Sequence, residues 1–172
     1  MSESKYLKMY DAVYSRKWLV TLLNIVRWAI TALTIVTYGW FLGYSVVKDL
    51  MLSVYLLVVT AVPFIAVSVM RRIINAPRPY EVFDCDALLA VKLSGGAGRS
   101  FPSRHVASVF IIGSAFTFVV PYVGIILMCL GILLAACRVL LGIHFIRDAI
   151  VGAIIGGASG VIGMLIVNIL FR

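Results

Sequence analysis

The chain contains two histidines, and each lies next to charged residues at the edge of an apolar segment. His144 precedes Asp148 by four residues, so in a helical segment both lie on one face and the carboxylate can accept the second imidazole N–H. An imidazole oriented in this way can attack phosphorus and form a phosphohistidine. We therefore interpret His144 as a candidate nucleophile, Asp148 as its orienting carboxylate and His105 as a candidate general acid.

Arginines occur within a turn or two of the same predicted membrane surface as these histidines. A guanidinium group matches the geometry of tetrahedral oxyanions such as phosphate, so a phosphate site is the simplest explanation. Ser103 precedes an apolar helix whose free N–H groups also favour an anion, and its hydroxyl can donate to the same group. The arginines in question are Arg71, Arg78, Arg104 and Arg138.

Other interpretations use the same residues. A membrane histidine is more often a packing or interfacial residue, and a noncatalytic anion-binding or transport protein would need the arginines without needing His144. Asp84 and Asp86 are better interpreted as helix-capping residues than as a metal site. The three cysteines have no zinc-like spacing, so we expect neither a metal nor another cofactor.

The composition is that of a membrane protein. The chain has 172 residues, of which 63% are hydrophobic and 13% charged, and its mean hydropathy is +1.10. A spanning helix needs roughly 20 apolar residues, so we expect a single all-α domain, residues 1–172, with five to six spans. The net charge of +8 does not indicate nucleic acid, because the basic residues occupy short gaps between apolar runs.

The chain can be divided into predicted elements. Residues 1–17 should form an interfacial amphipathic helix, residues 71–103 an active-site loop, and residues 94–100 a hinge within that loop. Arg27 is interpreted as an interfacial anchor of the first span. Gly152, Gly156 and Gly160 indicate close helix packing. The predicted spans cover about 18–47, 50–70, 104–120, 123–141 and 146–170, with a turn at Pro121-Tyr122.

The distribution of Lys and Arg predicts the orientation in the membrane. The side with the most basic residues is expected to be cytoplasmic, which places the active-site loop there in a multi-pass protein of the cell membrane. Only Lys48 and Arg172 fall on the other side. The crowded side holds Lys5, Lys8, Arg16, Lys17, Arg71, Arg72, Arg78, Lys92, Arg99, Arg104, Arg138 and Arg147.

Three segments resemble the signature of the type 2 phosphatidic acid phosphatase superfamily. Its motifs KxxxxxxRP, PSGH and SRxxxxxHxxxD are similar to residues 71–79, 102–105 and 137–148. The resemblance implies a metal-independent phosphatase, usually with six spans. It further implies that His144 attacks phosphorus, that His105 protonates the leaving group and that Asp148 orients His144. It assigns phosphate binding to Arg71, Arg78, Ser103 and Arg138.

The chain departs from those motifs at three positions. Arg71 replaces Lys and Cys137 replaces Ser, while Arg104 replaces Gly and so adds charge and bulk beside His105. Two roles for Arg104 remain open: it contacts a second phosphate or a head group, or it forms a salt bridge to Glu81, Asp84 or Asp86.

The sequence therefore predicts an integral membrane phosphatase acting on a lipid phosphate in the bilayer. Phosphatidylglycerophosphate is the preferred substrate if the site faces the cytoplasm, and undecaprenyl diphosphate if it faces outward. Phosphatidic acid fits either case, and we expect no nucleic-acid partner. The sequence does not indicate an oligomeric state.

Overall fold

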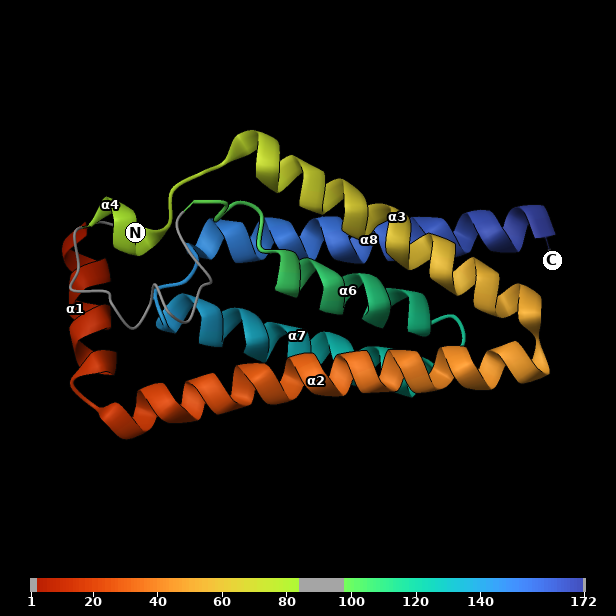
Figure 1. Ribbon diagram of the computed structural model, residues 1–172, viewed down its shortest axis with the longest axis horizontal. Coiled ribbons are helices and arrows are strands. Elements are labelled where there is room, and N and C mark those ends of the chain that lie inside the picture. Colours follow the sequence, from red (N-terminus) through yellow and green to blue (C-terminus); the bar gives the residue numbers. More distant parts are fainter. Residues whose placement is uncertain (1–2, 84–97, 172) are drawn as a thin grey trace.

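A computed structural model describes residues 3–83 and 98–171, and all regular structure in these residues is helical. Within these two ranges, four helices are long and apolar enough to cross a membrane, and they run along the long axis of the molecule (Figure 1). The predicted all-α membrane bundle is confirmed. The four helices are α2 (Lys17–Lys48), α3 (Leu50–Ile74), α7 (Pro121–Leu140) and α8 (Ile146–Phe171).

Helix α6 (Arg104–Phe116) is shorter than the predicted span over 104–120. Its 13 residues extend about 20 Å, whereas the hydrocarbon core is about 30 Å thick. The turn predicted at Pro121-Tyr122 instead occupies residues 117–120, because Pro121 fits the first turn of α7, where its missing N–H costs nothing. Figure 1 shows α6 beginning and ending within the length of α2. Its first residues therefore lie partway along the bundle and not at its end.

The glycines of α8 pack its backbone directly against α6. A Cβ on Gly152 would lie 2.7 Å from the Ser103 carbonyl oxygen, and one on Gly156 would collide with the Ala107 carbonyl oxygen. A Cβ on Gly160 would collide with the Ser114 hydroxyl. The predicted packing role of these glycines is confirmed, and the contact fixes the start of α6 against the start of α8.

Helix α1 (Glu3–Tyr14) lies across one end of the bundle (Figure 1). Tyr6, Tyr10 and Val13 are buried, while the charged side chains of the helix are exposed. The Tyr14 hydroxyl donates to the Leu141 carbonyl at 3.0 Å, just after α7 ends. The predicted amphipathic helix is present, and its apolar side packs against the protein.

Helix α3 continues past the predicted end at Met70 and finishes at Ile74, so Arg71 lies in its last turn. Asn75 ends the helix in the left-handed conformation, with a φ of 45°. A short helix, α4 (Pro79–Val82), follows after Arg78. The predicted loop over 71–103 therefore begins with the last turn of α3, which contains Arg71, and Arg78 directly precedes α4 in an extended conformation.

The interpretation of Arg27 as an interfacial anchor is wrong. Its side chain is 4% exposed, and Nε donates to Asn24 Oδ1 at 2.7 Å. Ten residues, about 15 Å of helix, separate Arg27 from the start of α2 at Lys17. The side chain therefore stays inside the bundle, where its guanidinium carbon lies 4.9 Å from the ring centre of Trp28.

Candidate active site

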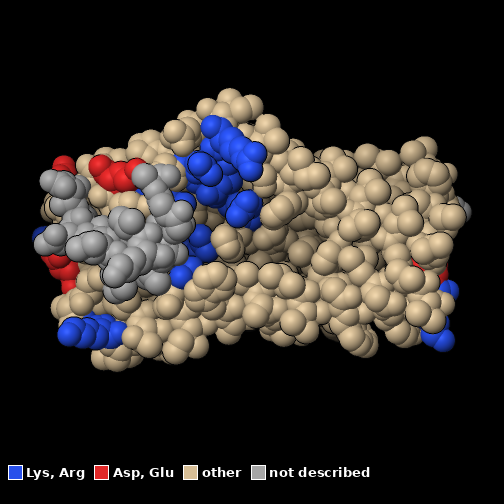
Figure 2. All heavy atoms as spheres, in the orientation of Figure 1, with Lys and Arg blue, Asp and Glu red and all other residues tan. Residues whose placement is uncertain are grey.

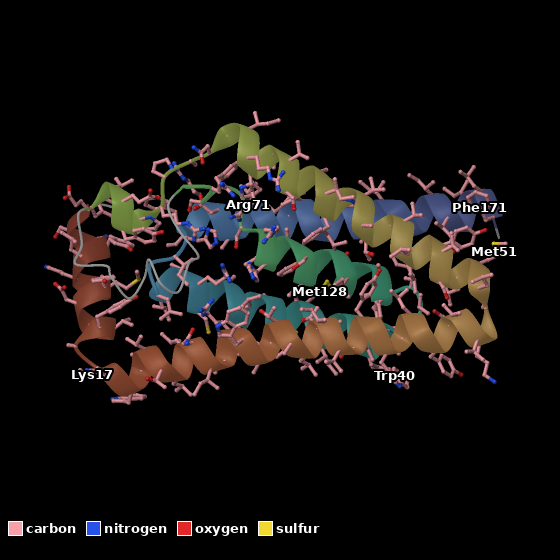
Figure 3. The ribbon with its side chains drawn as sticks, viewed as in Figure 1. Lys17, Trp40, Met51, Arg71, Met128 and Phe171 are labelled. Atoms are coloured by element: carbon pink, nitrogen blue, oxygen red, sulfur yellow. The ribbon has the colours of Figure 1, made fainter. Side chains whose placement is uncertain are left out.

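The predicted site residues come from segments that meet in one half of the bundle. These segments are the end of α3, the turn before α4, residues 98–103, the start of α6, the end of α7, the link to α8 and the start of α8. Figure 3 shows Arg71 at the end of α3 near the start of α6, while Met51 and Phe171 lie at the opposite end of the molecule. Figure 2 shows Lys and Arg side chains gathered in the half that holds α1.

His144 and Asp148 are both fully buried and face each other. Imidazole Nδ1 lies 3.8 Å from Asp148 Oδ2, which is longer than a direct hydrogen bond. Ser100 fills the gap: its hydroxyl donates to Asp148 Oδ2 at 2.5 Å and lies 3.3 Å from His144 Nδ1. The N–H of Phe145 also donates to Asp148 Oδ2, at 3.1 Å. The predicted pair is thus joined by a serine hydroxyl.

Sequence reasoning missed Ser100, which it placed in a hinge. The residue is buried, and its N–H donates to the Ala76 carbonyl at 2.9 Å, which holds the segment against the end of α3. The only signal in the sequence is a hydroxyl two residues before Pro102. That signal does not separate Ser100 from other serines, because its role depends on a contact with Asp148, 48 residues away.

The environment of His144 favours a neutral, nucleophilic imidazole. Burial and the charges of Arg138, Arg78 and Arg71 lower the pKa of His144 to about 3, although its interaction with Asp148 opposes the change. The acceptors near Nδ1 favour the tautomer that carries its proton there. The lone pair is then on Nε2, which lies 3.4 Å from Arg138 Nη2.

Backbone carbonyls hold two of the arginines in place. Arg71 Nη1 donates to the Pro102 carbonyl at 2.8 Å, and Arg78 Nε donates to the Gly98 carbonyl at 2.8 Å. Arg78 Nη1 also lies 3.5 Å from the Ile143 carbonyl, next to His144. Neutral acceptors orient the guanidinium groups but leave their positive charges available to an anion.

Two buried donors of the site lack partners among the described residues. They are the Ser103 hydroxyl and Arg138 Nε. The backbone N–H of Ser103 donates to the Asp148 carbonyl at 2.9 Å, so this serine is fixed to the start of α8. A buried donor without a partner costs about 1–3 kcal/mol, and a bound phosphate would supply acceptor oxygens for both.

His105 and Arg104 face a groove between α2, α3 and α6 with a volume of about 350 Å³. The wall is mostly apolar, and Thr34, Tyr38 and Thr60 add hydroxyl groups. Arg104 is exposed, with its guanidinium carbon 5.7 Å from the ring centre of Phe64. The groove connects the start of α6 with the apolar middle of the bundle.

The structure thus places every predicted site residue in one region. His144, Asp148, Ser103, Arg78 and Arg138 are buried, and Arg71 is partly buried. His105 is also partly buried, and it lies within electrostatic range of His144 and the arginines. The predicted helix-capping role of Asp84 and Asp86 falls outside the described residues.

Comparisons with known proteins identify a family and a curated relative. The model of a family described as the PAP2 superfamily matches residues 52–172. A lipid A 1-phosphatase of Rhizobium etli is 28% identical over 107 residues, which are 62% of this chain and 46% of that protein. The chain therefore spans about half the length of this relative.

Two solved structures share the fold. Aquifex aeolicus LpxE superposes with a TM-score of 0.70 and 21% identity, covering 92% of this chain and 94% of that one. A transmembrane PAP2 type phosphatidylglycerolphosphate phosphatase from Bacillus subtilis superposes with a TM-score of 0.67 and 22% identity. That match covers 99% of this chain and 89% of the other.

Proposed function

The chain belongs to the PAP2 superfamily, and from that premise we propose that it is an integral membrane phosphatase acting on a lipid phosphate monoester or diphosphate. One observation carries the proposal. A buried, neutral His144 presents Nε2 to Arg138, beside two buried donors that have no partner among the described residues. A phosphate placed there would receive charge-assisted hydrogen bonds and lie next to a nucleophile.

The reaction has two steps. His144 Nε2 attacks phosphorus, the bond to the leaving oxygen breaks, and His105 gives that oxygen a proton. Water then attacks the phosphohistidine, with His105 accepting the proton, and inorganic phosphate leaves. Asp148 and Ser100 hold the Nδ1–H side of the imidazole. Arg71, Arg78, Ser103 and Arg138 stabilise the charge on the transferring phosphoryl group, with no metal or other cofactor.

The groove supports a lipid as substrate. It starts at His105, the proposed donor to the leaving group, and runs between α2, α3 and α6 into the apolar part of the bundle. The apolar part of a leaving group would pass there from the bilayer into another apolar environment, so the groove would orient it by packing. The phosphate would stay with the arginines at the other end.

Phosphatidylglycerophosphate is the preferred substrate, because the basic residues favour a cytoplasmic site in the cell membrane. Undecaprenyl diphosphate is the alternative if the site faces outward. Lipid A 1-phosphate is a second candidate, since the relative from Rhizobium etli is named for that activity. A noncatalytic anion-binding or transport role would use the same arginines but would not need His144.

The test is phosphate release by the purified protein in detergent with a chelator, using these three lipids and phosphatidic acid. The wild type and a Lys48→Ala control, at the opposite end of α2, should release phosphate. His144→Ala should lower the rate by more than about 10³-fold. Equal release by His144→Ala, or loss of wild-type activity on adding the chelator, would contradict the proposal.

A further inference from the structure

Binding of the phosphate that is cleaved does not explain the position of Arg104. It is the first residue of α6, directly before His105, and both side chains line the groove between α2, α3 and α6. In the proposed reaction His105 protonates the leaving oxygen, so the groove lies on the leaving-group side. Arg104 is therefore placed to meet the part of the substrate that departs.

Of the three carboxylates considered as salt-bridge partners of Arg104, Glu81 belongs to the described residues, whereas Asp84 and Asp86 lie outside them. Glu81 instead accepts from the N–H of Arg78 at 2.7 Å and from the N–H of Gly98 at 2.9 Å. Asp148 is bound to Ser100 and pairs with Arg147. No ion pair of Arg104 occurs within residues 3–83 and 98–171, and its guanidinium contacts the face of Phe64.

Among the described residues, the positive charge around the site exceeds what one phosphate can balance. Seven arginines interact with one another or with Asp148, and Asp148 and Glu81 are the carboxylates that interact with them, which leaves five positive charges. A phosphate monoester brings about −1.5 to −2 at neutral pH. Positive charge therefore remains after one phosphate is bound, and Arg104 is the arginine that lines the groove beside the leaving group. The seven arginines are Arg27, Arg71, Arg78, Arg99, Arg104, Arg138 and Arg147.

We infer that Arg104 binds a second anionic group in the leaving part of the substrate, at the mouth of the groove, so that the enzyme prefers lipids with a second phosphate next to the scissile one. This inference rests on the proposed function. The second phosphate is either joined directly to the first, as in a prenyl diphosphate, or separated from it by a glycerol, as in phosphatidylglycerophosphate. Phosphatidic acid and a prenyl monophosphate lack it.

Two matched substrate pairs test the inference. One pair is farnesyl diphosphate and farnesyl monophosphate, and the other is phosphatidylglycerophosphate and phosphatidic acid with the same acyl chains. For each pair, the ratio of kcat/KM for the substrate with two phosphates to kcat/KM for the substrate with one is measured. The ratio does not depend on the folded fraction of a variant, so partial unfolding cannot imitate the effect.

Arg104→Gln should lower this ratio at least about tenfold in one or both pairs, because a charge-assisted hydrogen bond is lost. Arg104→Lys should restore part of it. Arg72→Gln is the control, since Arg72 is an exposed arginine at the end of α3, and its ratio should match that of the wild type. A drop in one pair alone identifies how the second phosphate is attached.

An unchanged ratio for Arg104→Gln in both pairs would overturn the inference while leaving the proposed function standing, provided that the wild type releases phosphate and His144→Ala does not. If the wild type released no phosphate from any of the four substrates, the proposed function would fail, and the inference with it.

Discussion

The two sides of α6 are packed in opposite ways. Toward α8, glycines bring the backbones into direct contact, and the Ser103 N–H bonds the Asp148 carbonyl at 2.9 Å. Toward α2 and α3, the same helix borders a groove of about 350 Å³. The packed side holds His144 and Asp148, whereas His105 and Arg104 line the open side, which would receive a leaving group whose shape can vary. Rigidity and adaptability are thus divided between two faces of one short helix.

The arginines of the site also differ in how firmly the protein holds them. Arg138 is buried beside His144, and Arg71 and Arg78 are held by backbone carbonyls. Arg104 is exposed at the groove. We therefore expect substitutions on the packed side to lower kcat/KM for every substrate. Substitutions on the open side should change the ratio of kcat/KM between substrates.

Gly152→Ala should have the largest effect. Its Cβ would lie 2.7 Å from the Ser103 carbonyl oxygen and would push the start of α6 away from Asp148. A displacement of about 1 Å at a reacting group can cost roughly 10²-fold, so we expect kcat/KM to fall by about that factor for all substrates. Gly157→Ala is the control, because its Cβ would meet only Phe110, at 3.9 Å. Wild-type rates for Gly152→Ala would show that the packed side does not fix the site.

The stability of the protein should depend on pH through His144. Its pKa is about 3 in the folded protein and about 6.5 in the unfolded chain, so between these values the unfolded state binds more protons. Lowering the pH from 7.5 to 5 should therefore reduce the contribution of His144 to the free energy of unfolding by about 2 kcal/mol. In His144→Asn, unfolding in mixed micelles should show a correspondingly smaller decrease. Identical pH dependence in both proteins would mean that His144 is not held neutral.

Ser100→Ala should lower kcat by roughly tenfold with little change in KM, because the hydroxyl that links Asp148 to His144 is lost while the phosphate ligands remain. Steady-state kinetics would separate the two constants. Ser159→Ala removes a hydroxyl that bonds only within α8 and serves as the matched control. An increase in KM at constant kcat would instead assign Ser100 to substrate binding.

The smallest effect is expected on the open side. Ala61 lines the groove on α3, and Ala66 on the same helix is exposed on the outer surface. Ala61→Phe should lower kcat/KM for a long-chain lipid relative to its short-chain analogue by roughly threefold, because the ring takes packing contacts from the chain, and Ala66→Phe should not change this ratio. Equal losses for long and short chains would show that the groove does not hold the lipid.

Much of the fold could be predicted because short stretches of sequence indicate its helices. Apolar runs of sufficient length marked α2, α3, α7 and α8, and glycines at intervals of four marked the face of α8. The length of α6 could not be predicted, since the apolar run continues past Phe116. Arg27 was misassigned although the start of α2 was predicted to within one residue, because its burial depends on which face of the helix packs against the bundle.

The residues of the candidate site that belong to the three motifs could be predicted from the sequence. His105, His144, Asp148 and the arginines were found because the motifs fix their positions within short segments. Ser100 and the groove residues come from separate segments and become neighbours only in the folded chain, so no local pattern marks them. The open side of α6 is therefore the part of the site about which the sequence said least.

Trapping of the covalent intermediate is the sharpest test of the proposed reaction. Purified protein is mixed with a lipid substrate labelled in its terminal phosphate, quenched within milliseconds in alkali and analysed by peptide mapping. We expect an alkali-stable, acid-labile phosphate on His144 in the wild type and none in His144→Ala. Alkali-stable label retained in His144→Ala, or no such label in a wild-type protein that turns over the same substrate, would contradict the proposed reaction.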